Sequence, residues 1–230
     1  MFYFWDWTYV ILLPAIVLSL VAQMRVTAAY NRYSQVKTRR GITAEMLVRE
    51  MFNRAGLMDV KIEMTHGKMS DHYDPRSRTL RLSEGVMHSD SVAALGIAAH
   101  EAGHALQHRD EYGPLTLRNA SVATVNIGSS LSWPLVLLGI VLSFEPVIYA
   151  GIALFSVVVL FSLITLPVEF NASRRALQAL EGGAYLDSEE LKGARSVLSA
   201  AALTYVASAL TAILQLVRLI AISGVGRRRD

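Results

Sequence analysis

Four long runs of uncharged residues constrain the fold of this chain more than any other feature. They cover residues 7–24, 119–144, 146–168 and 196–217. Because a helix needs roughly 20 mostly apolar residues to cross the hydrocarbon core of a bilayer, each run is a candidate transmembrane helix. The content of 53% hydrophobic and 18% charged residues agrees with this interpretation. The sequence therefore predicts a mostly α, polytopic membrane protein with about four transmembrane helices.

Aromatic residues precede and open the first run: Phe2, Tyr3, Phe4, Trp5 and Trp7. Such residues gather at membrane–water interfaces. The segment lacks a basic region at its start and a clear small-residue cleavage site, so we expect an uncleaved anchor rather than a signal peptide. The chain has no cysteine, which excludes disulfides and cysteine-ligated metal sites.

Basic residues flank the apolar runs, and their distribution predicts the topology. Lys and Arg beside membrane spans mark the cytoplasmic side, so we expect an outside N-terminus with residues 25–118 and 169–195 in the cytoplasm. Arg174 and Arg175 are interpreted as topology determinants. Four complete spans place the basic tail outside, against the charge rule, and Arg218 interrupts the last apolar segment. The net charge of +3 is too small to suggest a nucleic-acid partner.

The polar stretch between the first two runs is long enough for a small α+β domain. We expect a helix capped by Thr43 and ended by Gly56, a strand at 59–64, a β-hairpin at 71–86 and a long helix at 90–108. The second hairpin strand, TLRLS (79–83), has two readings that the sequence leaves open. It either packs inside the hairpin or pairs with an extended substrate.

These features divide the chain into six predicted segments. They are an N-terminal membrane anchor (1–24), a polar α+β domain (25–118), a transmembrane hairpin (119–168), a cytoplasmic helical segment (169–195), a C-terminal membrane helix (196–222) and a basic tail (223–230).

The stretch AAHEAGHALQH, residues 98–108, contains the pattern His-Glu-x-x-His within the predicted helix. Residues four apart in an α-helix lie within about 40° of each other, so His100 and His104 can direct their imidazoles at one metal ion. Glu101 lies on the adjacent stripe, where it can accept a proton from a zinc-activated water. We expect small residues such as Gly103 to leave room around the metal. The motif indicates a catalytic site with one Zn²⁺ and Glu101 as general base.

A catalytic zinc needs a third protein ligand and an open position. The metzincin continuation is absent, because Gln107 and Asp110 stand where it requires Gly and His. His108 lies about 80° round the helix from His100 and two turns on, so we expect it to be exposed or to act outside the ligand set. Glu169 follows the third apolar run on the same predicted side as the motif. We expect it to be the third ligand, supplied by a turn at the membrane exit.

Four stretches of the chain carry a family resemblance: DHYDPRSRTLRLSEGV, AAHEAGHALQH, NIGSSLSWP and LPVEFNASRRAL. In these the chain resembles the YugP-type membrane zinc metallopeptidases of the neutral zinc metallopeptidase family, over nearly its whole length. It is more distantly similar to the HtpX and CAAX prenyl proteases. The resemblance implies that His100, His104 and Glu169 bind zinc and that Glu101 is the general base.

Two positions depart from the patterns of these families. Ser173 stands where the prenyl proteases have Asp, so a carboxylate that orients a ligand histidine is missing there. Asn171 stands where YugP relatives often have Asp, and it keeps hydrogen-bonding capacity without the charge. Together with His108, these two residues are our candidates for positions that support the metal ligands.

The sequence thus predicts a plasma-membrane metalloprotease that hydrolyses peptide bonds at the cytoplasmic membrane surface. Residues 25–118 are then its zincin-like, zinc-binding protease domain. Its expected partners are a membrane-associated protein or peptide substrate and the lipid bilayer, with membrane partner proteins or a homo-oligomer also compatible. The alternative is a non-catalytic, zinc-stabilised membrane scaffold, which would not need Glu101. A transporter is disfavoured because Arg218 is the one ionisable residue within the apolar segments. Intramembrane proteolysis is disfavoured because the motif lies outside the runs.

Overall fold

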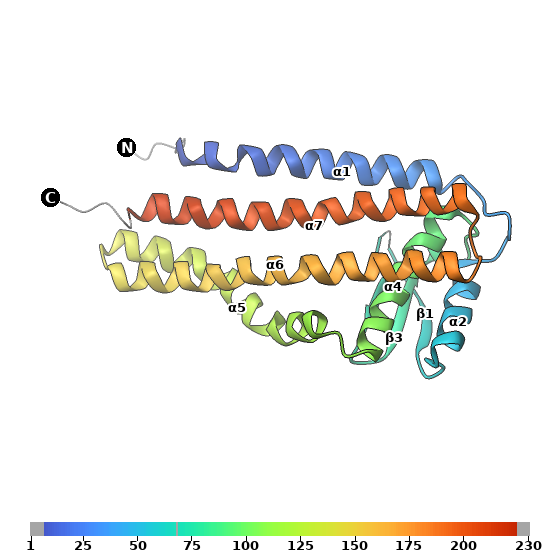
Figure 1. Cartoon of the computed structure of the whole chain (residues 1–230). Coiled ribbons are helices and arrows are strands. Elements are labelled where there is room, and N and C mark those ends of the chain that lie inside the picture. The colour runs from blue at the N-terminus through green and yellow to red at the C-terminus, as the bar shows by residue number, and fades with distance from the viewer. Residues whose placement is uncertain (1–6, 68, 225–230) are drawn as a thin grey trace. The chain divides into compact units, whose positions relative to one another are not determined.

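The computed structural model describes residues 7–67 and 69–224. Four of its helical stretches are long and apolar enough to cross a membrane: Trp7–Tyr33, Gly113–Val141, Glu145–Gly182 and Ser188–Ser223. They correspond to a 3₁₀ turn (Trp7–Leu12) followed by α1 (Leu13–Tyr33), and to α5, α6 and α7 (Figure 1). The prediction of a mostly α, polytopic membrane protein is confirmed. The aromatic residues 2–5 and the three arginines of the tail, 227–229, lie outside the described residues.

Internal contacts divide the chain into two compact units. One contains the described residues up to Ala22, the segment Leu117–Leu166 and the described residues from Thr204 onwards. The other contains Gln23–Thr116 and Pro167–Leu203. Helices α1, α5, α6 and α7 therefore each contribute residues to both units.

In the first unit, α5 (Gly113–Val141) and α6 (Glu145–Gly182) pack closely through small residues. A Cβ added at Gly151 would lie 2.8 Å from the carbonyl oxygen of Ser132, and one at Gly128 would lie 3.0 Å from that of Leu154. Small residues are typical of transmembrane helix contacts because they let the backbones approach. These glycines hold α5 and α6 together as a tight helical pair.

Arg218 on α7 is buried in this first unit and is held by polar and aromatic neighbours. Its Nε donates a hydrogen bond to Oγ1 of Thr8 over 3.1 Å. Its guanidinium lies 3.8 Å from the ring centroid of Tyr9 and 5.4 Å from that of Trp133. Cation–π contacts and hydrogen bonds offset the cost of removing a charge from water. An arginine is therefore compatible with a helix of this apolar character.

The second unit contains the α+β part that the sequence predicted. Helix α2 (Ala44–Ala55) begins at Thr43, whose side chain accepts from Met46 N, and ends at Gly56 in the left-handed conformation with φ 71°. Left-handed backbone is the usual helix end that glycine permits. Both predicted helix boundaries are confirmed.

Three short strands form the sheet: β1 (Lys61–Thr65), β2 (His72–Asp74) and β3 (Thr79–Ser83), in the order β1-β3-β2. β3 pairs in parallel with β1 and antiparallel with β2, so the predicted hairpin is confirmed. Because β3 has a neighbour on each side, its backbone groups are already paired. The idea that TLRLS binds an extended substrate by strand addition is therefore wrong, and the edges of the sheet are β1 and β2.

Helix α4 (Val92–Arg109) forms the centre of this unit and carries the His-Glu-x-x-His motif. It begins at Ser91, whose hydroxyl accepts from Ala94 N, and it follows the short helix α3 (Glu84–Met87). Its buried residues pack in one core with α2, with β3 and with side chains of α6 and α7 such as Leu180 and Leu198. Burial on several sides fixes the rotation of α4 and so the direction of its histidines.

Candidate metal centre

His100, His104 and Glu169 lie together in the second unit, where one ligand atom from each is within 4.8 Å of the others. The Oε2 atom of Glu169 lies 3.2 Å from Nε2 of His100 and 3.7 Å from Nε2 of His104. The two imidazole rings meet edge to face, with centroids 4.9 Å apart. The structure thus brings together the three residues that the sequence predicted as metal ligands.

Glu169 belongs to the interior of α6 and not to a turn. The helix runs without a break from Glu145 to Gly182 and includes Pro167. The expected membrane-exit turn is therefore wrong. A proline lacks one backbone donor, but neighbouring packing keeps such residues within long apolar helices. Glu169 is only 3% exposed, and the rigid helix fixes where its carboxylate points.

Gly103 explains how closely α4 approaches α6 at this point. A Cβ added there would lie 2.6 Å from the carbonyl oxygen of Ala172 and 3.2 Å from its carbonyl carbon. Backbone cannot yield as a flexible side chain does, so only glycine fits without a shift of one helix. From the sequence we expected Gly103 to leave room around the metal. In the structure it instead allows the helix contact that brings Glu169 to the histidines.

Ser173 supports His100 from one turn beyond Glu169 on α6. Its Oγ lies 3.1 Å from Nδ1 of His100, the ring nitrogen that does not face Glu169. A hydroxyl can donate or accept, so Ser173 orients the ring in either tautomer. The position where prenyl proteases carry Asp therefore still contacts a histidine of the cluster, with a neutral group.

Gln107 fixes the orientation of His104 more strictly than Ser173 fixes that of His100. This role of Gln107 was not predicted from the sequence. Its side chain is fully buried, and its Oε1 lies 2.9 Å from Nδ1 of His104. Its Nε2 lies 2.8 Å from the backbone oxygen of Val168, which can only accept. The amide orientation is therefore fixed with Oε1 toward His104. Because an amide oxygen only accepts, Nδ1 of His104 carries a proton, and in the neutral imidazole the lone pair is then on Nε2.

A chain of polar contacts continues from Gln107 to the surface of the unit. Asn171 Oδ1 accepts from Gln107 Nε2 over 2.9 Å and from Arg175 Nε over 2.8 Å. The same arginine donates to Asp110, at the end of α4. Hydrogen bonds and charges of Arg109 and Arg175 lower the pKa of Asp110 to about 2. Asn171 therefore contacts His104 through Gln107. Arg175 has a structural contact that its interpretation as a topology determinant did not include.

Glu101 lies next to this cluster on α4 and contacts the sheet. Its Oε2 accepts the backbone N–H of Tyr73, in the edge strand β2, over 3.2 Å. Removal from water raises the pKa of Glu101 to about 7, against the lowering effect of His100. A carboxyl whose pKa lies near neutrality can both accept and return a proton. The burial of Glu101 thus gives it the property that general base catalysis requires.

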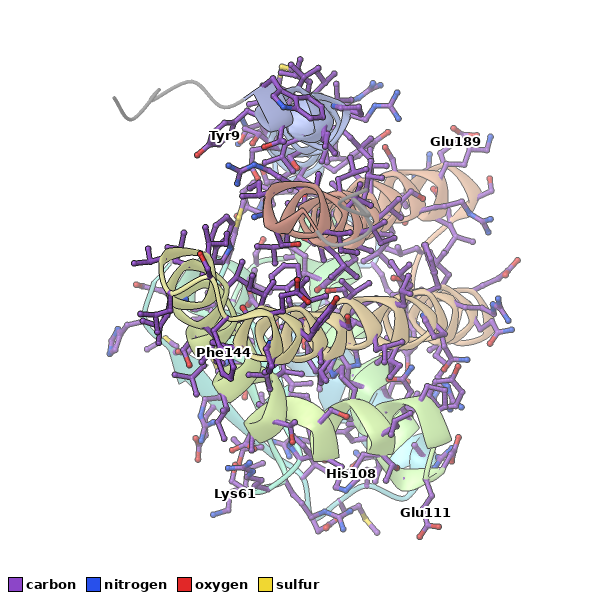
Figure 2. The ribbon with its side chains drawn as sticks, turned by 90° about the vertical axis from the view of Figure 1, so that its left-hand side faces the viewer. Tyr9, Lys61, His108, Glu111, Phe144 and Glu189 are labelled. Atoms are coloured by element: carbon purple, nitrogen blue, oxygen red, sulfur yellow. The ribbon has the colours of Figure 1, made fainter. Side chains whose placement is uncertain are left out.

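His108 lies apart from the three clustered residues. Its Nδ1 is 2.8 Å from the hydroxyl of Tyr73, and the two rings are tilted with centroids 5.9 Å apart. Figure 2 labels His108 and Glu111, both near the end of α4. Since Tyr73 also holds Glu101 through its backbone, His108 contacts the strand beside the site and not the cluster itself.

The cluster fits a zinc ion by its donor types and its spacing. Two imidazoles and one carboxylate make up a known catalytic ligand set that leaves one position open. Ligands about 2.0–2.2 Å from a tetrahedral zinc are roughly 3.3–3.6 Å from each other. The Nε2–Oε2 distances of 3.2 and 3.7 Å lie just on either side of that range. The Nδ1 atoms are both engaged elsewhere, which leaves the Nε2 atoms for a metal.

Apolar spanning helices and a His-His-Glu cluster together define a membrane protein with a candidate metal centre. The chain belongs to the family described as "Putative neutral zinc metallopeptidase", whose model matches residues 8–224. It is 44% identical over 215 residues to the "Putative membrane protease YugP" of Bacillus subtilis (strain 168), covering 94% of this chain and 96% of that protein. No solved structure matches the chain.

Proposed function

We propose that this chain is a membrane-embedded zinc metalloprotease that hydrolyses peptide bonds at the membrane surface. The observation that carries this proposal is the contact of Glu169 with both histidines of the motif, at 3.2 and 3.7 Å from their Nε2 atoms. Membership of a zinc metallopeptidase family and similarity to a membrane protease support it. The chain is thereby assigned one Zn²⁺, held by Nε2 of His100 and His104 and by Oε2 of Glu169.

Each supporting contact has a part in holding that ion. Zinc bound there supplies a Lewis acid that polarises the scissile carbonyl and lowers the pKa of a water molecule towards neutrality. Gln107 keeps the proton of His104 on Nδ1, so that its Nε2 is available as a ligand. Ser173 restrains the ring of His100 through Nδ1. Residues that hold ligand histidines in this way raise metal affinity.

Glu101 has the role of general base in this proposal. Its carboxylate takes the proton of the attacking water and returns it to the nitrogen of the departing amine. A pKa of about 7 lets the same group do both near neutral pH. The N–H of Tyr73 holds one carboxylate oxygen and leaves the other for the proton.

The edge strand β2 is the proposed place for the substrate backbone. β2 lies at the border of the sheet, and the N–H of its Tyr73 already donates to Glu101. An extended peptide added along this edge would receive main-chain hydrogen bonds from its other backbone groups. It would then cross directly beside the proton acceptor, which the central strand β3 could not provide. We place this reaction at the cytoplasmic face of the plasma membrane, on the charge pattern of the flanking residues.

The experiment that tests the proposal compares the N-termini of membrane proteins in cells that carry the intact protein or Glu101→Gln. We expect a set of new N-termini that needs the intact protein and disappears with the variant. Those substrates should then be cleaved by the purified intact protein. Identical sets of N-termini in the two kinds of cell would contradict the protease assignment. If Glu101→Gln also restored the growth of cells that lack the protein as well as the intact protein does, a zinc-stabilised scaffold would be favoured.

A further inference from the structure

A cavity of about 490 Å³ lies between the second half of α1 and the first half of α7, within the second unit. These two helices run side by side (Figure 1). Polar side chains line the cavity from both: Arg25, Arg32 and Tyr33 from α1, and Ser196 and Ser199 from α7. None of these residues belongs to the candidate metal centre.

The two arginines bring positive charge to this cavity without a carboxylate to balance it. They are seven positions apart, about two helical turns, so they lie on the same side of α1. Both are exposed, and among the described residues neither forms an ion pair. Their neighbours Lys37 and Arg39 do pair with aspartates. Arg32 lies over the ring of Tyr33, 5.3 Å from its centroid, and both residues line the cavity.

The cavity also lies at a membrane boundary as judged from each helix separately. On α1, Arg25 directly follows the first uncharged run. On α7, Ser196 begins the fourth uncharged run. The phosphate groups of lipids lie at this depth, and basic residues beside membrane spans attract anionic headgroups. Small side chains at Ala28 and Ala200 leave the space between the helices open.

We propose that this cavity binds the phosphate-bearing headgroup of an anionic phospholipid. Guanidinium groups form paired hydrogen bonds to phosphate oxygens, which suits Arg25 and Arg32. The hydroxyl of Ser196 adds a donor from the opposite wall. A headgroup held by both helices would link α1 to α7 at the membrane surface. This site is independent of the metal centre and of the proposed peptidase activity.

The test uses the full chain in nanodiscs of phosphatidylcholine with or without one quarter phosphatidylglycerol, and counts the lipids retained by native mass spectrometry. The parent protein should retain phosphatidylglycerol in preference to phosphatidylcholine. The double variant Arg25→Gln/Arg32→Gln should lose affinity for phosphatidylglycerol by roughly 30-fold, the loss expected for two basic contacts at an anionic surface.

The matched control is Arg49→Gln/Arg76→Gln, which removes two exposed charges from the same unit, at positions that neither line the cavity nor flank an apolar run. It should change the affinity by less than about threefold, since distant exposed charges are screened. An equal loss in both double variants would overturn the proposal, because net charge alone would explain the binding. Unchanged retention in Arg25→Gln/Arg32→Gln would also overturn it.

A second arm separates a lipid from a soluble phosphate. Inorganic phosphate is added to the detergent-purified protein, and its thermal unfolding is compared with that in phosphatidylglycerol. Stabilisation by phosphatidylglycerol alone, lost in Arg25→Gln/Arg32→Gln, supports the lipid site. Equal stabilisation by inorganic phosphate would overturn the lipid assignment. Zinc content of every variant is measured to establish that the second unit is folded.

Discussion

The Oε1 atom of Gln107 lies 2.9 Å from Nδ1 of His104 and faces the proton on that nitrogen. The relationship is rigid because the amide also donates to Val168 O and to Asn171 Oδ1. His104 is thereby held in the tautomer that offers Nε2 to a metal. Gln107 does not touch the predicted ligand atom Nε2, yet it determines which nitrogen of His104 is available to bind zinc.

Replacing this glutamine should weaken zinc binding without removing a ligand. In Gln107→Met the side chain keeps its approximate volume but loses the acceptor for His104 and the donors for α6. Because residues that hold ligand histidines contribute about 10–100-fold to metal affinity, we expect the zinc dissociation constant to rise by that factor. Competition with a chelator of known affinity measures it. The adjacent His108→Gln should leave the constant unchanged, since His108 contacts Tyr73 instead. Equal constants for Gln107→Met and the parent protein would contradict the tautomer argument.

The role of Glu101 is separated from metal binding by an isosteric change. Glu101→Gln keeps the shape of the side chain but cannot accept a proton. We expect hydrolysis to fall by about 10²–10⁴-fold, the usual contribution of a general base, with zinc content unaltered. Cleavage of a substrate peptide and metal analysis on the same preparation provide both readouts. A variant that lost its zinc as well would show that Glu101 acts as a ligand, contrary to our assignment.

Much of the fold could be predicted from the sequence because its signals are local. Uncharged runs predict spanning helices, and Thr43 and Gly56 predict the ends of α2 by their own hydrogen bonding and backbone freedom. The His-Glu-x-x-His spacing places two imidazoles together in any regular helix. Such signals need no knowledge of distant residues.

The remaining features depend on contacts that no local pattern contains. Gln107 gains its role from a carbonyl 61 positions away, so its sequence neighbourhood gives only a weak hint through its place one turn after His104. A turn was expected before Glu169, yet α6 continues through Pro167 without a break. The alternation in TLRLS indicates a strand but does not distinguish an edge strand from a central one, and only the sheet order shows that it is central.

Gly103 should be intolerant of even a methyl group. Gly103→Ala places a Cβ 2.6 Å from the oxygen of Ala172, so α4 and α6 must separate. Overpacking of this kind typically costs about 1–3 kcal/mol, and we expect weaker zinc binding alongside a lower unfolding temperature in detergent.

Gly96→Ala is the matched control on the same helix. Its Cβ would meet Ala194 Cβ at 3.5 Å, an ordinary contact. Alanine also favours the helix by up to about 1 kcal/mol, so the control should be neutral or stabilising. An equal loss of zinc affinity and unfolding temperature in Gly103→Ala and Gly96→Ala would contradict the claim that the close contact of Gly103 with α6 brings the helices together.

The predicted topology can be tested directly because the chain has no cysteine of its own. His66→Cys, in the exposed loop after β1, should react with a membrane-impermeant maleimide only after the cells are opened. Leu142→Cys, exposed between α5 and α6, should react in intact cells. The expectation follows from the basic residues that flank the runs. Labelling of His66→Cys from outside would reverse the assigned orientation of the metal centre.

Zinc affinity in Glu169→Ala tests the central claim most directly, because Glu169 joins α6 to the two histidines of α4. The matched control is Glu181→Ala, which removes an exposed carboxylate from the same helix. We predict that native mass spectrometry with chelator competition shows stoichiometric, parent-like zinc binding in Glu181→Ala and a large loss of affinity in Glu169→Ala. Stoichiometric zinc in Glu169→Ala at the affinity of the parent protein would contradict the account.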